Sequence, residues 1–262
     1  MRYFLCLSYS GADFCGWQIQ PGSPSVQAAL EAALSRLLNR PVQVTGAGRT
    51  DTGVNAVNYV AHFNLDGALP FGTSDFIYKL NAILPRSVAV FSVAPVPEEF
   101  HARFSARRRE YTYFIHRRKD PFCAPWSWQC GYPNLDFDAM NEACKYLLGT
   151  HDFSCFEKTG GDNKTSVCTV MDAFWTPYTP SHIQIMGGCE AAPSPEPSYW
   201  YFRIAADRFL RNMVRAIVGT LIEVGRGKQD PAWVARLIAG GTRGDAGESV
   251  PGHALFLNKV EY

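Results

Sequence analysis

Hydrophobic and polar residues alternate at the start of the chain, where residues 2–9 read RYFLCLSY. A period of two is typical of a β-strand with one buried face. The pattern then changes to a helical spacing, and Ser23 and Pro24 fit the cap and the first position of a helix. The chain is therefore expected to begin with a strand and an amphipathic helix. The apolar stripe of that helix is Val26, Leu30, Leu34, Leu37 and Leu38.

The same periodicities predict the elements of two halves. Strands are expected over residues 42–47, 54–65 and 88–96, and a helix over 75–84, which gives the order β-α-β-β-α-β. A similar order begins again after residue 107, with strands over 110–117, 165–175, 199–205 and 253–262 and with helices that begin near residues 136, 209 and 230. This pattern predicts an α+β protein of two ferredoxin-like, split β-α-β halves with antiparallel sheets, residues 1–105 and 106–262.

The net charge of the chain conceals two basic segments. The 25 lysines and arginines nearly balance the 24 acids, which leaves a formal charge of +1. Between residues 101 and 119, however, a run of arginines and one lysine faces a single acid, Glu110, and a second cationic stretch covers residues 203–228. Local basic segments of this kind favour contact with nucleic-acid phosphates even in a chain of neutral total charge.

Cysteine spacing and hydropathy argue against two other classes of protein. The eight cysteines include no CxxC pair, and no histidine stands at zinc-finger spacing, so no metal site is expected. No stretch approaches the roughly 18 apolar residues of a membrane span. We therefore expect a cytoplasmic protein with reduced thiols and no membrane partner.

The first candidate for chemistry is the segment GAGRTDTGV at residues 46–54. Its three glycines permit tight turns and the close approach of a ligand, so Arg49 and Asp51 could be held at the mouth of a cleft. The alternative is a polar hairpin turn in which Asp51 caps backbone amides. A nucleotide-triphosphate loop is not indicated, because the segment lacks a GK[ST] ending and no helical pattern follows it.

The second candidate is the predicted strand that follows arginines 107–109. Tyr111 and Tyr113 lie on one face of this strand and could stack on a shared partner. Aromatic faces beside arginines suit an unstacked base and its phosphates. A core strand packed under a helix would show the same pattern.

The third candidate is the segment DRFLRNMVRAIVG at residues 207–219. Arg208, Arg211 and Arg215 fall at helical spacing and predict a cationic stripe, for which a solvated face is the alternative at the first two positions. Arg215 lies deeper in the apolar sequence, where an arginine needs a carboxylate partner.

These three segments resemble the motifs of the TruA family of tRNA pseudouridine synthases, which read GRTDAGV, R-x-Y-x-Y and F-L-x-x-M-V-R. They stand here at residues 49–54, 109–113 and 209–215, and further similarities occur in the same order at residues 16–18, 26–27, 100–104, 149–153 and 250–257. The resemblance implies roles for five residues. Asp51 would be the nucleophile, Arg215 its partner, Tyr111 the uracil-stacking residue, Arg49 the side chain that fills the space of the flipped base, and Leu255 a packing surface for the pyrimidine.

The resemblance also implies a central RNA-binding cleft between the halves, a homodimer, and isomerisation of uridines 38 to 40 in the anticodon arm of tRNA without a cofactor. Three positions depart from the usual family pattern. Thr52 stands where alanine is common, Asn55 where histidine is frequent, and Ala254 where a glycine usually occurs. None of these departures removes a catalytic group.

Two other functions fit parts of the same pattern. The basic segments and the tyrosine face also suit a non-catalytic tRNA-binding module, which would bind tRNA without altering it. A glycosidase or nucleosidase could use Asp51 together with a second acid, Asp13 or Asp152, and would release free uracil.

Overall fold

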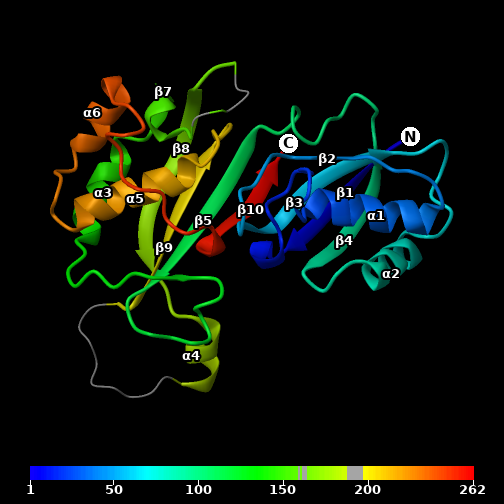
Figure 1. Cartoon of the computed structure of the whole chain (residues 1–262), viewed down its shortest axis with the longest axis horizontal. Coiled ribbons are helices and arrows are strands. Elements are labelled where there is room, and N and C mark those ends of the chain that lie inside the picture. Colours follow the sequence, from blue (N-terminus) through cyan, green and yellow to red (C-terminus); the bar gives the residue numbers. More distant parts are fainter. Residues whose placement is uncertain (159, 161–163, 188–196) are drawn as a thin grey trace. The chain divides into compact units, whose positions relative to one another are not determined.

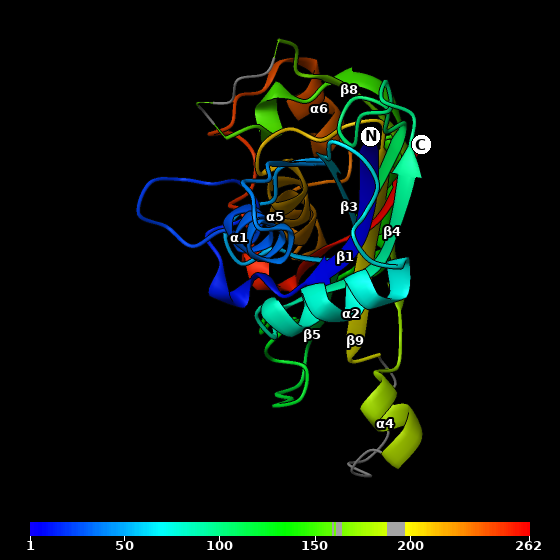
Figure 2. The same ribbon diagram turned by 90° about the vertical axis from the view of Figure 1, so that its right-hand side faces the viewer.

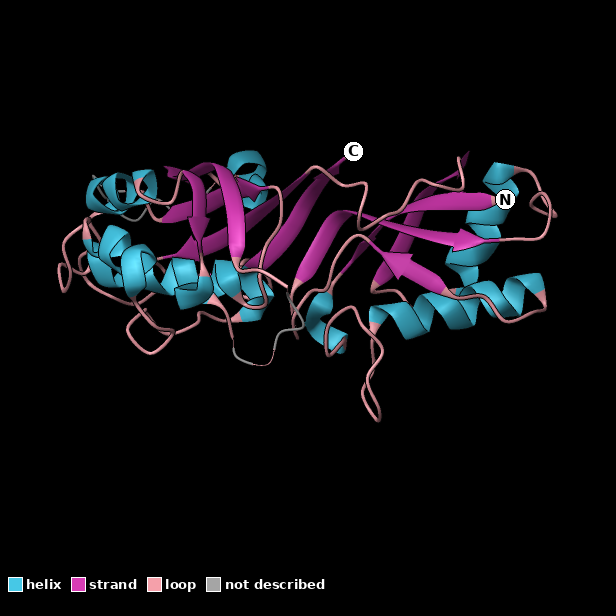
Figure 3. Cartoon of the chain, turned by 90° about the horizontal axis from the view of Figure 1, so that it is seen from above, coloured by secondary structure: helices cyan, strands magenta, loops and turns pink. Residues whose placement is uncertain are grey.

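The computed structural model describes residues 1–158, 160, 164–187 and 197–262 (Figure 1). They form two compact units, one of residues 1–109 with 256–262 and the other of residues 110–255. Each unit is a mostly antiparallel sheet with helices against it (Figure 3). The α+β class that the sequence predicts is therefore confirmed.

The first unit has a four-stranded sheet in the order β4-β1-β3-β10, with the short β2 beside β3. Strand β1 pairs antiparallel with β3 and β4, and β10 pairs parallel with β3. The predicted order β-α-β-β-α-β is confirmed for residues 1–96. The elements are β1 (Arg2–Tyr9), α1 (Val26–Leu38), β2 (Val44–Gly46), β3 (Asn55–Asn64), α2 (Thr73–Ile83), β4 (Val88–Val96) and β10 (Leu255–Glu261).

Strand β1 and helix α1 supply much of the core of this unit. Alternate residues of β1 are buried, among them Leu5 and Leu7, and α1 lies along one face of the sheet (Figure 2). Burying one leucine side chain contributes roughly 1.5–3 kcal/mol. The predicted cap at Ser23 is wrong, because Ser25 takes the extended conformation that a cap requires and its Oγ accepts a hydrogen bond from the amide of Ala28 at 3.2 Å.

The second unit has a sheet in the order β5-β9-β8-β7, with β6 beside β5. Helix α5 is buried along almost its whole length and packs against α3. Asp136 caps α3 as predicted, since its carboxylate accepts from the amide of Ala139 at 2.8 Å. The elements are β5 (Arg108–His116), β6 (Trp128–Gln129), α3 (Phe137–Lys145), β7 (Gly149–Asp152), β8 (Val167–Pro177), α4 (Ser181–Met186), β9 (Tyr199–Ala206), α5 (Met213–Gly225) and α6 (Trp233–Gly240).

The start of helix α5 corrects one prediction. The helix begins at Met213 and not at residue 209, because Asn212 adopts a left-handed conformation with φ 64°. The carboxylate of Asp207 accepts from the amides of Thr169 and Arg208, at 2.8 and 2.7 Å, and fixes the preceding residues as a loop. Arg208 and Arg211 therefore precede the helix and form no cationic stripe with Arg215.

The thiols of the described residues are reduced and mostly buried. The seven cysteines in this part of the chain are free thiols. Burial raises the pKa of Cys130 and of Cys155 to about 11, so both remain protonated at neutral pH. No helix within the described ranges is long and apolar enough to cross a bilayer.

Candidate functional site

Asp51 lies in the loop between β2 and β3, residues 47–54, which we call the acid loop. Within this loop Thr50 is buried, Asp51 is half-buried and Arg49 is exposed. The amide of Val54 donates to the carbonyl of Asp51 at 3.1 Å, and Gly53 has φ 77°, so residues 51–54 form a tight turn. The acid therefore sits on irregular backbone whose shape depends on its supports.

An aromatic cluster of the first unit supplies those supports. The rings of Trp17 and Tyr59 stack with centroids 4.2 Å apart. The hydroxyls of Tyr9 and Thr50 lie 2.9 Å apart, and the amide of Trp17 donates to the carbonyl of Thr50 at 3.2 Å. The Tyr59 hydroxyl donates to the carbonyl of Gly48. The acid loop is thus held at Gly48, just before Arg49, and at Thr50, just before Asp51.

Two glycines allow the cluster to approach the acid loop this closely. A Cβ atom on Gly16 would lie 2.3 Å from the carbonyl oxygen of Thr50, and Gly16 also has φ 98°. A Cβ on Gly46 would lie 2.1 Å from the Tyr59 hydroxyl and 2.5 Å from the Trp17 ring. Neither position accommodates a side chain without displacement of the loop or the cluster.

Arg109 and Asn55 are further supports that the sequence analysis did not assign. The Arg109 guanidinium Nη2 donates to the carbonyl of Ala47 at 3.0 Å, so this arginine holds the start of the acid loop. The side-chain oxygen of Asn55 accepts from the amide of Gly11 at 2.9 Å. Arg109 could be singled out by its place in the R-x-Y-x-Y segment, but nothing in the sequence indicates that its partner is Ala47.

Tyr111 and Tyr113 are both placed by strand β5 in the second unit, yet their surroundings differ. Tyr111 is 8% exposed, and its ring packs edge-on against Phe209 with centroids 5.0 Å apart. Tyr113 is fully buried, and its hydroxyl donates to the carbonyl of Pro251 at 3.0 Å. The expectation that both tyrosines stack on a shared partner is therefore wrong for Tyr113, which is a core residue.

Arg215 occupies the first turn of α5 and is half-buried. Its Nε donates to the carbonyl of Val250 at 2.7 Å, and its own carbonyl accepts from the amide of Val250 at 3.3 Å. Burial raises the pKa of the Tyr113 hydroxyl, and the positive charge of Arg215 opposes this shift. Arg215 and Tyr113 thus both bond the segment of residues 250–251 in the second unit. This segment precedes Leu255, whose side chain is buried.

The predicted site residues therefore fall into two sets. Arg49 and Asp51 belong to the first unit, and Tyr111, Arg215 and Leu255 belong to the second. Each set is held by contacts within its own unit. The pairing of Asp51 with Arg215 stays a prediction.

Asp152 is one of the two further acids, with Asp13, that hydrolytic chemistry could use. Its carboxylate accepts from the amide of Ser154 at 2.8 Å, and hydrogen bonds from Ser166 and Ser154 hold its pKa below the usual range. These contacts are those of an aspartate that stabilises its own turn.

Comparisons with known proteins find relatives along the whole chain. The family described as tRNA pseudouridine synthase matches residues 5–105 and 143–262. A tRNA pseudouridine synthase A from Parabacteroides distasonis is 46% identical over 262 residues, which cover 100% of this chain and 96% of the relative. Its counterpart from Bacteroides thetaiotaomicron is 45% identical, with coverages of 100% and 90%. The tRNA pseudouridine synthase A 2 of Clostridium perfringens is 37% identical, with 98% of each chain covered.

Proposed function

Since the chain belongs to the tRNA pseudouridine synthase family, we infer that it is an isomerase that converts uridine to pseudouridine in tRNA. In this reaction the uracil is detached from C1′ of the ribose, turned, and rejoined through C5. Substrate and product have the same atoms and the same oxidation state. The chemistry therefore requires an activated attacking group and a site that holds the detached uracil in place. It requires no cofactor.

Asp51 is the proposed nucleophile. An aspartate side chain is ordinarily ionised at neutral pH, and a neighbouring guanidinium favours the ionised form. In the proposed mechanism Arg215 supplies that guanidinium when tRNA excludes water from the site. The support for Asp51 is the rigidity of its loop, because Thr50 and Gly48 are fixed by the aromatic cluster. A rigid loop keeps the carboxylate in one place during the attack.

The target uridine must leave its stack before Asp51 can reach it. Extrusion of a base costs a few kcal/mol. Stacking of the extruded base on an aromatic ring contributes about 1–3 kcal/mol and so offsets part of this cost. Tyr111 is the residue proposed to provide the ring. Arg49, which is exposed, would fill the space of the flipped base, and Leu255 would pack on the pyrimidine.

The substrate in this proposal is the anticodon arm, with uridines 38 to 40 as targets. The basic segment of residues 101–119 offers phosphate contacts through its exposed side chains, which are Arg103, Arg107, Arg118 and Lys119. Arg108 and Arg109 are engaged within the protein, with Glu261 and with Ala47. Because each neutralised phosphate releases counterions, binding of tRNA should weaken steeply with salt.

The proposal extends to the architecture and assembly of the protein. The β-α-β-β-α-β order of the first unit supports a ferredoxin-like half, and the second unit would be its counterpart, with the RNA-binding cleft between them. The motif resemblance supports a homodimer, and a tRNA substrate supports a cytoplasmic location.

The decisive experiment replaces Asp51 by alanine and by asparagine. Pseudouridine in treated tRNA is read by carbodiimide labelling, and tRNA affinity is measured by filter binding. Both variants should lose all detectable isomerisation and retain the affinity of the wild type, because the basic residues are untouched. Full activity in either variant would overturn the assignment of Asp51.

Asp13 offers the matched control, since it is an exposed acid of the same unit. The Asp13→Asn variant should isomerise uridine like the wild type. Free uracil is measured in every reaction, and its release by the wild type would support a nucleosidase instead. A wild type that binds tRNA without any isomerisation would support a binding module.

A further inference from the structure

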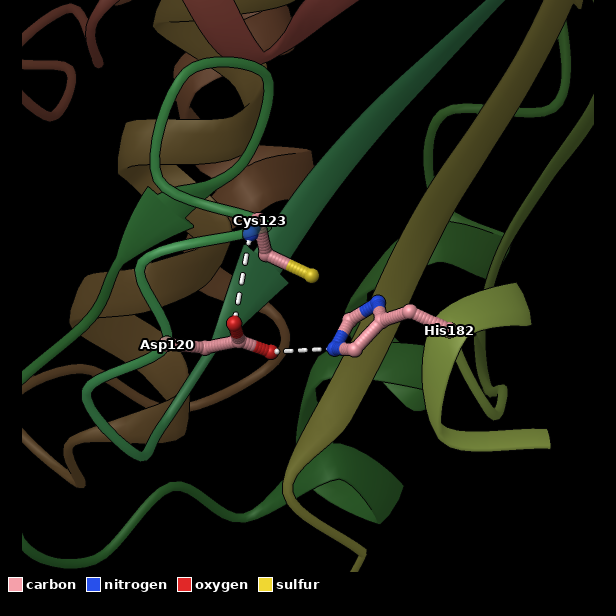
Figure 4. Close-up of side chains that lie close together, drawn as sticks. All are labelled: Asp120, Cys123 and His182. Atoms are coloured by element: carbon pink, nitrogen blue, oxygen red, sulfur yellow. Dashed lines mark hydrogen bonds and ion pairs between the residues drawn. The ribbon is translucent and has the colours of Figure 1, made fainter. Parts of the chain in front are cut away.

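A second cluster of chemically capable side chains lies in the second unit, outside the proposed reaction site. Asp120, Cys123 and His182 each direct one donor atom to a common point, and these three atoms lie within 4.8 Å of one another (Figure 4). Asp120 and Cys123 belong to the turn that follows β5, and His182 belongs to helix α4. We call these three residues the Asp-Cys-His cluster.

The carboxylate of Asp120 is held in place by several donors. Its Oδ2 accepts from the Tyr199 hydroxyl at 2.8 Å and from Nε2 of His182 at 3.0 Å. Its Oδ1 accepts from the amides of Phe122 and Cys123, at 2.9 and 3.3 Å. Metal-binding carboxylates are commonly oriented by such outer hydrogen bonds.

Among the described residues, His182 links helix α4 to the turn that carries Asp120 and Cys123. The helix has six residues, none of which is buried, and a helix this short is not stable by its own hydrogen bonds. Both views place it away from α5 and α6, at the other end of β9 (Figures 1 and 2). Its contacts with the 120–123 turn run through His182, whose ring lies 5.4 Å from that of Phe122.

We propose that the Asp-Cys-His cluster binds a zinc ion, which ties α4 to the 120–123 turn. One carboxylate oxygen, one thiolate and one imidazole nitrogen form a donor set that suits zinc. In a tetrahedral site with bonds of about 2.0–2.3 Å the ligand atoms lie roughly 3.3–3.8 Å apart, so the cluster needs shifts of only about 1 Å. A water molecule would complete the coordination on the side where His182 is partly exposed.

Binding would change the protonation of two ligands. Zinc replaces the thiol proton of Cys123, which passes to solvent. The proton on Nε2 of a neutral His182 is given up to solvent and Nδ1 takes one, so that Nε2 can bind the ion. Asp120 keeps its charge. Each zinc ion bound at neutral pH thus releases the proton of the thiol, and no redox step occurs.

Metal content tests the proposal directly. The full-length protein is stripped with a chelator, given equimolar zinc, passed through a desalting column and analysed by mass spectrometry for metals. The wild type and a Cys6→Ser control should retain equimolar zinc, and Cys123→Ser should lose it. Cys6 is the matched control because it is a half-buried thiol in β1, in the other unit. Substitution with cobalt adds a spectrum that reports a thiolate ligand.

A Tyr199→Phe variant distinguishes a zinc site from a cluster that is held together by hydrogen bonds alone. It keeps all three ligands and removes one of the hydrogen bonds that orient Asp120. Zinc affinity should fall about 10- to 100-fold. Hydrogen exchange of the α4 amides should slow when zinc is added to the wild type.

The proposal is overturned if the wild type retains no metal and shows no thiolate band with cobalt, or if Cys123→Ser binds zinc as tightly as the wild type. Isomerase assays on the same samples show whether the proposed function fails independently.

Discussion

The acid loop of the first unit and the first turn of helix α5 in the second unit, which carries Arg215, are stabilised in different ways. The acid loop is irregular backbone, fixed by hydroxyls and rings that reach it from β1, from β3 and from residues 16–17. Arg215 lies on a regular, buried helix, and its own guanidinium bonds the carbonyl of Val250. In the first region neighbours position the functional residue, whereas in the second the functional residue is itself part of the packing.

This difference predicts different effects of substitution. Changes around Asp51 should alter the geometry of the loop and therefore the rate of the chemical step. Changes at Arg215 should remove both a charge and a structural contact, so they should affect activity and stability together. The following variants test this contrast, beginning with the largest expected effect.

Replacing Arg215 by methionine should lower kcat by about 10²–10³, because the guanidinium proposed to keep Asp51 ionised is lost. The same variant should unfold at lower urea concentration, since the bond to Val250 is also lost. The Arg215→Lys control keeps the positive charge but lacks the planar set of N–H donors of a guanidinium. It should therefore recover only part of the wild-type kcat. A methionine variant with normal kcat would remove Arg215 from the proposed chemistry.

Replacing Gly16 by alanine should cost about 3 kcal/mol in the free energy of unfolding, because the new Cβ meets the carbonyl of Thr50 in a backbone region that disfavours side chains. The acid loop should shift, and kcat should fall with stability. Urea unfolding and isomerisation kinetics measure the two effects.

Gly22→Ala is the matched control, since Gly22 has φ 70° but no atom within 4 Å of its added Cβ. It should cost only about 1 kcal/mol and leave kcat unchanged. Equal losses in the two variants would mean that positive φ alone, and not the approach to Thr50, determines the effect.

A pH series isolates the stability of the first unit through His62. Burial and the charge of Arg2 lower the pKa of His62 to about 4, and its Nδ1 accepts from the amide of Ala102 at 3.1 Å, which requires the neutral ring. The unfolded chain binds the proton near pH 6.5, so stability should fall as pH decreases from there toward 4. Between pH 7.5 and 5 the share of the loss that comes from His62 should be about 2 kcal/mol in urea unfolding. A His62→Gln variant should show a shallower dependence, and an unchanged slope would assign the effect to other groups.

The sequence predicted the long periodic elements well, because their burial patterns repeat locally. It failed where distant contacts decide the structure. Strand β10 follows the second unit in chain order, yet it pairs parallel with β3 and belongs with the first unit. Helix α5 begins four residues later than its apolar pattern indicates, because Asn212 is left-handed and Asp207 bonds the amide of Thr169. The elements β6, β7 and α4 are too short to produce a recognisable period.

The candidate site divides in the same way. From sequence alone, the glycines and charges of residues 46–54 fitted either a loop that holds Asp51 at a cleft or a polar hairpin turn. The supports Tyr9, Trp17 and Tyr59 could not be predicted, since each comes from a separate segment. The expectation of no metal considered close cysteine and histidine spacings, which cannot detect the Asp-Cys-His cluster formed by two distant segments.

The smallest expected effects come from one chemical change made in both regions, the removal of a tyrosine hydroxyl. The Tyr59 hydroxyl donates to Gly48 in the acid loop, and the Tyr113 hydroxyl donates to Pro251 in the second unit. Each Tyr→Phe variant should lose about 1 kcal/mol of stability, because one partly buried carbonyl loses its donor. Their kinetics should differ. Tyr59→Phe loosens the loop that carries Asp51 and should lower kcat about 10-fold, whereas Tyr113→Phe leaves the acid loop intact and should keep kcat within about 3-fold of the wild type. Single-turnover rates on tRNA measure the chemical step directly. If Tyr113→Phe slowed that step more than Tyr59→Phe, the acid loop would not be the region in which geometry controls the rate.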